Sequence, residues 1–100
     1  MPRLNGVLET ALYVDDMDRA RVFFEGVMGL EPFNADHRFT AYDVGANTVL
    51  LLFLQGETLD TVVLPNDMGT IPPHDGKGRV HLAFAIAKRE LTAWERQLSD

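Results

Sequence analysis

The chain has 100 residues, the size of one small domain, and its 15 acidic and 9 basic residues give a formal net charge of −6. Because the basic residues are scattered and outnumbered, we expect no nucleic-acid partner. No cysteine is present, which excludes disulfides, thiolate metal sites and a cysteine nucleophile. An apolar signal core is absent and no apolar run approaches the roughly 20 residues of a membrane span, so we expect a cytoplasmic protein without a membrane partner.

The first part of the sequence has the pattern of a strand followed by a helix. Residues 7–14, VLETALYV, alternate with a period of two, which predicts a strand. Asp16 then offers an N-cap side chain, and the apolar residues that follow recur at helical spacing. Gly29 suits the left-handed position that often ends a helix, so an amphipathic helix is predicted between these two residues.

Three more strand-like segments follow this helix. Residues 31–36, EPFNAD, predict a loop or a short edge strand, because Pro32 cannot donate a hydrogen bond to a central ladder. Residues 38–44 alternate again, and the GAN sequence at 45–47 predicts a tight hairpin turn. Residues 48–55 are apolar on both faces, as in a strand covered from both sides. The predicted order of the first half is therefore β-α-β-β-β.

Residues 56–78 contain four glycines and three prolines, which predicts a crossing linker or a functional loop with room for one short strand at 61–64. After it, residues 79–86, RVHLAFAI, again alternate like a strand. The segment beyond has apolar residues at the spacing i, i+3 and i+7, which predicts a second helix.

The two strand-plus-helix units look like an internal repeat. Glu9 and His81 hold the same strand position in the two units, and each is followed by one residue and then an alanine. Repeats with a matched polar residue suggest two copies of one module. The first copy continues with three strands, whereas the second copy stops after its helix at Asp100. We therefore expect a truncated second module, or a partner chain that covers the exposed sheet edge.

The quoted motifs carry a family resemblance. LETALYVDDMDRARVFFEGVMGLEP resembles the opening of proteins in the vicinal oxygen chelate superfamily, which holds glyoxalase I, bleomycin resistance proteins, fosfomycin resistance enzymes and extradiol dioxygenases. PPHDGKGRVHLAFAI resembles the start of the second module of the same superfamily. The resemblance implies an α+β fold in one domain: a βαβββ module at about 7–55, a linker at about 56–78, and the β-α start of a truncated second module at about 79–100.

In that superfamily a divalent metal lies between the first strands of two paired modules. Carried over to this chain, the resemblance makes Glu9 and His81 metal ligands, with a third ligand expected beyond Asp100. A fourth position falls at Leu51, which cannot bind metal, so classical glyoxalase I activity is disfavoured. One imidazole with carboxylates suits Fe, Mn, Zn, Ni or Mg without choosing among them. Without the resemblance, both residues are equally well explained as polar strand residues with no metal.

Two further residues are candidates for substrate binding. Tyr13 shares the predicted strand face of Glu9, and His74 lies in the PPHDG sequence before the second unit. The alternatives are a tyrosine that packs in the core and a histidine that shapes a turn.

The resemblance favours a metal-dependent enzyme that acts on a small oxygen-rich substrate by lyase, thiol transferase or dioxygenase chemistry. One alternative is a metal-free protein that binds a small, antibiotic-type molecule without catalysis, and another is a paralogue that has lost its site. The resemblance also implies a homodimer.

Overall fold

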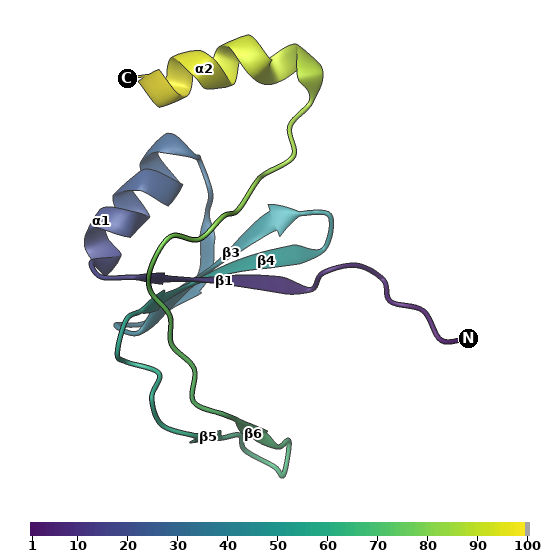
Figure 1. The fold of residues 1–100 in the computed structure, drawn as a ribbon, viewed down its shortest axis with the longest axis vertical. Coiled ribbons are helices and arrows are strands. Elements are labelled where there is room, and N and C mark those ends of the chain that lie inside the picture. The colour runs from purple at the N-terminus through teal and green to yellow at the C-terminus, as the bar shows by residue number, and fades with distance from the viewer. Residues whose placement is uncertain (100) are drawn as a thin grey trace.

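A four-stranded sheet with a helix on one face forms the centre of the computed structural model, which describes residues 1–99 (Figure 1). Its strands are β1 (Glu9–Val14), β2 (Pro32–Ala35), β3 (Phe39–Gly45) and β4 (Thr48–Leu54), in the order β1-β4-β3-β2. β1 runs parallel to β4, and the other pairs are antiparallel. The predicted order of elements in the first half is confirmed, and the EPFNAD segment forms an edge strand.

The β3–β4 hairpin turns where the GAN sequence predicts it. Ala46 and Asn47 connect the strands and have φ angles of 51° and 61°. Two consecutive positive φ angles match the twist of the flanking strands in a two-residue hairpin. The turn therefore sets the register in which β3 and β4 pair.

The first helix begins and ends as predicted, but its second half is wider than an α-helix. α1 (Met17–Arg21) begins after Asp16, whose side chain accepts a hydrogen bond from the Arg19 N–H at 3.0 Å. The chain continues as a π-helix, η1 (Val22–Val27), and Gly29 follows with a φ of 75°. A left-handed residue at this point needs no Cβ, which explains the glycine.

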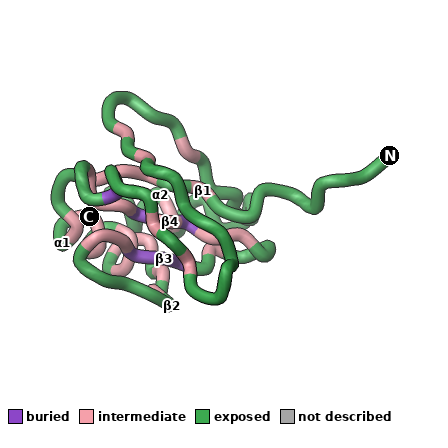
Figure 2. The backbone as a smooth tube through the Cα atoms, turned by 90° about the horizontal axis from the view of Figure 1, so that it is seen from below, coloured by how far each residue is buried: buried purple, intermediate pink, exposed green. Residues whose placement is uncertain are grey.

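The core lies between this helix and the sheet. Tyr42, Leu50 and Leu52 are fully buried there, and apart from Thr58 every buried residue of the described chain belongs to β3 or β4 (Figure 2). The partly buried residues packed around them come from both halves of the chain: Leu12, Val14, Met17, Ala20, Phe24, Leu30, Val44 and Leu82. The radius of gyration is 15.7 Å, whereas a compact domain of this length has about 13 Å. The chain is therefore open, with segments that project from the sheet.

The linker forms a small hairpin of its own, β5 (Val62–Val63) with β6 (Thr70–Ile71), on the side of the sheet opposite the helix (Figure 1). One of its two strands matches the short strand expected at 61–64. Beyond the linker, residues 78–87 cross the sheet on the helix side, where Leu82 packs against the core.

The strand predicted at residues 79–86 is wrong. This segment has the alternation of a strand, but it pairs with no other strand among residues 1–99. Alternation describes which side chains share a face, whereas a strand also needs a neighbour for its backbone hydrogen bonds. The segment is therefore extended chain rather than part of a sheet.

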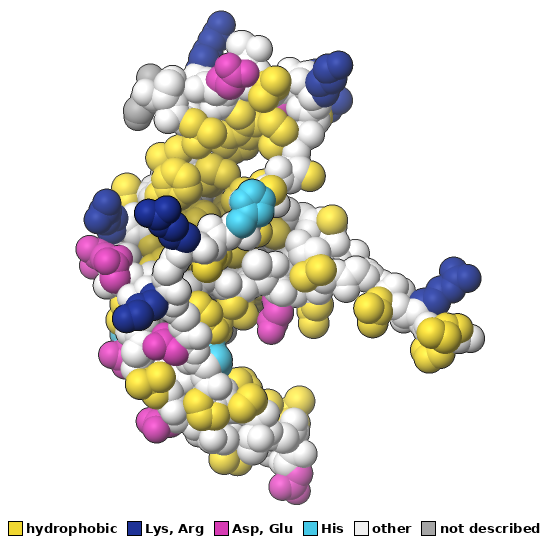
Figure 3. All heavy atoms as spheres, in the orientation of Figure 1, with side chains coloured by type: hydrophobic (Ala, Val, Ile, Leu, Met, Phe, Trp, Pro, Cys, Tyr) yellow, Lys and Arg dark blue, Asp and Glu magenta, His cyan; other side chains and the backbone are white. Residues whose placement is uncertain are grey.

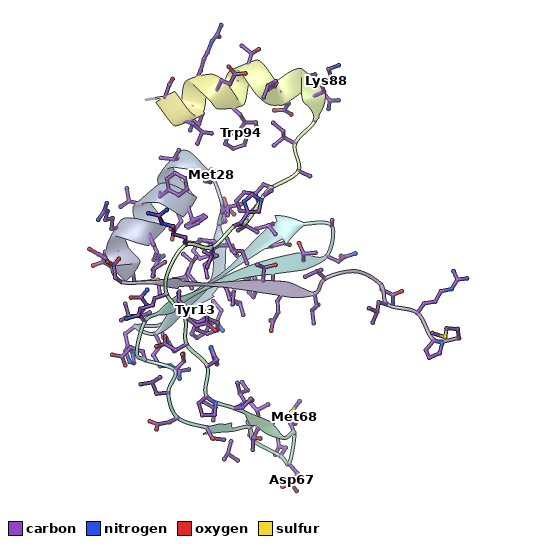
Figure 4. All side chains as sticks on the ribbon, in the orientation of Figure 1. Tyr13, Met28, Asp67, Met68, Lys88 and Trp94 are labelled. Carbon is purple, nitrogen blue, oxygen red and sulfur yellow. The ribbon has the colours of Figure 1, made fainter. Side chains whose placement is uncertain are left out.

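The second helix is present as expected. A 3₁₀ turn, η2 (Lys88–Glu90), leads into α2 (Leu91–Ser99), and Trp94 points from α2 toward Met28 at the end of the first helix (Figure 4). The Gln97 amide donates a hydrogen bond to the Val27 carbonyl at 3.0 Å. Within residues 1–99 no helix has the length and apolar character needed to cross a membrane.

Candidate functional site

The sheet face that the helix leaves uncovered is one wall of a cavity of about 700 Å³. Alternate residues of β1 point to this face, so that Glu9, Ala11 and Tyr13 line it together. Ala11 lies opposite Leu51 of β4, and Tyr13 lies opposite Phe53. The β5–β6 hairpin forms the facing wall, and Figure 3 shows the molecule hollowed between the hairpin and the sheet.

The cavity is mainly apolar and carries few charged groups. Its acidic residues are Glu9 and Asp60, and its basic residue is Arg38, which directly precedes β3. The Glu9 side chain makes no hydrogen bond or ion pair with another residue of the described chain 1–99. This carboxylate is therefore free to bind a ligand from the β1 wall.

Tyr13 and His74 meet at one end of the cavity. The Tyr13 hydroxyl and the His74 Nδ1 atom share a hydrogen bond of 2.7 Å, although the two residues are 61 positions apart. The His74 and Phe53 rings meet edge to face, with centroids 4.5 Å apart and planes at 73°. Tyr13 stacks on Phe53 with centroids 5.7 Å apart. Three rings thus close this end, and both predicted substrate-binding residues line the cavity.

Hydrogen bonds between residues of the linker hold its backbone around His74. The His74 backbone N–H donates to the Thr58 carbonyl at 2.9 Å, and the Thr58 hydroxyl donates to the His74 carbonyl. The Gly56 N–H donates to the Asp75 carboxylate at 3.2 Å. A Cβ at Gly76 would lie 2.7 Å from the Tyr13 ring, so only glycine lets the chain approach the ring so closely. The sequence analysis did not identify Thr58 or Gly76 as site residues. The available signal was the position of Gly76 directly after His74 and Asp75, which indicates a close approach of the backbone.

Of the two predicted metal ligands, only Glu9 is among the residues that line the cavity. Glu9 lines the cavity, whereas His81 is an exposed residue of segment 78–87 and is not among the cavity residues. No group of three or more potential ligands gathers anywhere within residues 1–99, and the third predicted ligand lies beyond the described residues. A divalent ion needs several donors around one point. The donors in place at the cavity therefore do not fit such an ion by themselves.

A polar cluster joins the helix to the sheet behind the cavity wall. The Tyr42 hydroxyl donates to the Glu25 carboxylate at 2.9 Å, and the Arg21 Nε atom donates to it at 2.5 Å. The Arg21 hydrogen bond holds the pKa of Glu25 below its usual range. Burial and this acidic neighbour raise the pKa of Tyr42 to about 12. Sequence reasoning did not find this cluster, because its members are 4 and 17 positions apart on different elements.

Comparison with known proteins finds structural relatives. No protein-family model and no curated protein sequence matches the chain. Among solved structures, the chain is similar to a lactoylglutathione lyase from Agrobacterium tumefaciens, with 30% identity and a TM-score of 0.78 over 97% of this chain and 70% of that one. It is also similar to an integron cassette protein from the mobile metagenome of the Halifax Harbour sewage outfall, with 17% identity and a TM-score of 0.68 over 96% and 70% of the two chains.

Proposed function

Because the chain belongs to the vicinal oxygen chelate superfamily, the family of glyoxalase-like proteins, we propose that its cavity binds and transforms a small oxygen-rich molecule. The observation that carries this proposal is the cavity of about 700 Å³ on the open face of the sheet. Sites for small molecules are typically apolar hollows of about 300–1,000 Å³ with a few polar groups. Glu9, Tyr13 and His74 supply such groups here.

We propose Glu9 and His81 as ligands of a divalent metal ion in the working protein. Glu9 is already at the cavity, so the proposal depends on His81 reaching the same face, either by movement of segment 78–87 or from a second copy of the chain. A bound metal in such a site supplies Lewis acidity toward oxygen atoms of the substrate.

Metal analysis tests this assignment. We expect the purified full chain to bind a divalent ion, and we expect Glu9→Gln and His81→Ala each to lower the bound amount at least tenfold. His37→Ala is the matched control, because His37 is an exposed histidine outside the cavity. Equal metal content in all four proteins would overturn the assignment.

For the reaction we favour lyase-type chemistry over thiol transfer and dioxygenation. The support is that the relative with 30% identity is named a lactoylglutathione lyase. Leu51 lines the cavity at the position where the resemblance puts a fourth ligand, so we expect the substrate to differ from lactoylglutathione. An assay with lactoylglutathione checks this expectation, and turnover by the wild-type chain would contradict it.

A metal-free binding protein is the second candidate. It is favoured by the apolar walls that Leu51, Phe53 and Leu64 give the cavity. The two candidates separate when a ligand found by screening is titrated before and after chelation with EDTA. Unchanged affinity after chelation supports the binding protein, and loss of affinity supports the metal site.

We propose a homodimer as the working form. β1 is an outer strand of the sheet, and its second edge pairs with no strand of residues 1–99. Val80, Phe84 and Ile86 of segment 78–87 expose apolar surface. A second copy that offers this strand-like segment to β1 would cover both features.

A further inference from the structure

We propose that Tyr13 is a positioning residue that fixes the His74 imidazole, so that the Nε2–H group of His74 donates a hydrogen bond to an oxygen acceptor of the ligand. The inference rests on the proposed function, because it assigns one polar contact inside the cavity that is proposed to hold the ligand. It concerns the end of the cavity where Tyr13, Phe53 and His74 meet, away from the Glu9 carboxylate on the same strand.

The first step is the protonation of the His74 ring. The Tyr13 hydroxyl and the His74 Nδ1 atom are 2.7 Å apart, so one of them donates to the other. A phenol is a stronger acid than a neutral imidazole N–H group, and an unprotonated imidazole nitrogen is the better acceptor. The hydroxyl therefore donates to Nδ1. In the neutral ring the proton then lies on Nε2, because the hydrogen bond at one nitrogen sets the state of the other.

The second step is the position of Nε2. This atom has no hydrogen-bond partner among residues 1–99, and it is not a buried polar atom without a partner. It is therefore open to solvent, and His74 is one of the residues that line the cavity. We place this donor on the cavity side of the ring, where a molecule in the cavity can accept its hydrogen bond.

The third step is that the ring is held before any ligand arrives. Two hydrogen bonds join His74 to Thr58, which is buried, and the His74 and Phe53 rings pack edge to face. Gly76 lets the linker backbone pass close to the Tyr13 ring, where an added Cβ would lie 2.7 Å from a ring atom. A group that is oriented in advance loses little freedom on binding, which makes its hydrogen bond effective.

The surroundings define the class of ligand. Phe53 offers apolar surface beside the His74 ring, Leu51 adds apolar surface elsewhere in the cavity, and the ring offers one donor. This combination fits a molecule with an apolar body that carries a carbonyl, carboxylate or ether oxygen. A molecule of the same shape without an acceptor leaves the donor unpaired, which lowers its affinity.

Nitrogen NMR of the imidazole rings tests the protonation. The full chain has three histidines, and exposed His37, which lies outside the cavity, serves as the internal reference. At a pH where all rings are neutral, we expect His74 to carry its proton on Nε2 alone, with its Nδ1 signal displaced from that of His37. In Tyr13→Phe this displacement should vanish while the amide spectrum stays folded. A proton on Nδ1, or a His74 signal that Tyr13→Phe leaves unchanged, would overturn the proposal.

Two matched probes test the ligand contact. Acetophenone has a carbonyl oxygen where α-methylstyrene, of the same shape, has a CH₂ group. We expect acetophenone to bind about fivefold more tightly and to move the His74 Nε2 signal. His74→Gln keeps a donor near the Nε2 position and should retain the preference, whereas His74→Asn should lose it. Equal binding of the two probes to the wild-type chain would overturn the contact.

The imidazole NMR and the probe-binding experiment distinguish a failure of this inference from a failure of the proposed function. The imidazole spectrum reads the Tyr13–His74 contact whether or not the chain binds metal or has a catalytic activity. A protein with the expected spectrum and probe preference but without metal content at Glu9 retains this inference and loses the metal assignment. A protein that binds metal at Glu9 but lacks the expected spectrum retains the metal assignment and loses this inference.

Discussion

Single side chains connect the helix to the sheet behind the cavity, and their ionisation makes stability depend on pH. Since the pKa of Glu25 is lowered in the folded chain, its carboxylate stabilises the fold above the usual glutamate range, and this contribution is lost as the pH falls through the lowered value. Since the pKa of Tyr42 is raised from 10.0 to about 12, the neutral hydroxyl stabilises the fold below pH 10, and this contribution is lost as the pH rises toward 12.

We therefore expect Glu25→Gln to lower the free energy of unfolding at neutral pH by about 1 kcal/mol. The variant loses the ion pair with Arg21, which contributes little because solvent screens it, and it weakens the hydrogen bond from the Tyr42 hydroxyl. The difference from wild type should shrink as the pH falls. Urea unfolding at a series of pH values measures it. Glu31→Gln, at an exposed glutamate, is the control. A difference that stays constant down to acidic pH would contradict the assignment.

Gly76 is the residue that lets the linker reach Tyr13. We expect Gly76→Ala to lower the free energy of unfolding by about 1–3 kcal/mol, because the added Cβ would lie 2.7 Å from the Tyr13 ring and the linker must shift. The same variant should return the His74 imidazole signal toward that of His37.

Gly26→Ala is the matched control for this variant. Apart from the adjoining residues and the backbone of the same helix, no atom lies within 4 Å of the added Cβ there, and a helical alanine is favoured over glycine by about 0.5–1 kcal/mol. The two alanine variants should therefore change stability with opposite signs in urea unfolding. A stabilised Gly76→Ala chain with an unchanged His74 signal would show that the close approach is not needed.

At the scale of elements, the start of the first helix depends on one side chain. We expect Asp16→Ala to destabilise the fold by about 1 kcal/mol, because the Arg19 N–H loses its acceptor at 3.0 Å. Asp15→Ala removes a neighbouring exposed carboxylate that does not cap the helix, and it should change stability by less than about 0.5 kcal/mol. Thermal unfolding of the two variants compares them directly, and equal losses would argue against the cap.

Elements whose signals are local were predictable from the sequence. The Asp16 cap, the Gly29 stop and the turn at Ala46 and Asn47 act within a few residues, and the structure confirms all three. The wider turns of η1 and the missing strand at 79–86 were not predictable in this way. Both depend on which segments lie alongside, and alternation in sequence carries no information about a neighbour.

At the scale of the whole molecule, the proposed dimer makes a concentration-dependent prediction. We expect Val80→Lys to raise the dimer dissociation constant at least tenfold, because it places a charge on apolar surface that a second copy would cover. Val63→Lys is the matched control: Val80 is 73% exposed and Val63 is 76% exposed, but Val63 lies on the linker hairpin. Sedimentation velocity over a dilution series measures both. A wild-type chain that stays monomeric at high concentration would contradict the dimer.

The candidate site was partly predictable at this scale. The period-two pattern of β1 placed Glu9 and Tyr13 on one face, and the structure puts both on the cavity wall. The site residues from the second half were harder to place. His74 reaches Tyr13 across 61 positions, whereas His81 does not reach the cavity in the described chain.

The sequence by itself determined the βαβββ order, the helix cap and stop, and the hairpin turn, because each of these depends on residue types at short, regular spacings. Only the tertiary structure decided that the linker folds back over the open sheet face, that Thr58 and Gly76 hold it there, and that His74 rather than His81 joins the β1 residues at the cavity. The physical reason is that contacts between distant segments follow from the packing of the whole chain. Here the linker lies over the sheet because His74 forms a 2.7 Å hydrogen bond with Tyr13 and because Gly76 has no Cβ to collide with the Tyr13 ring.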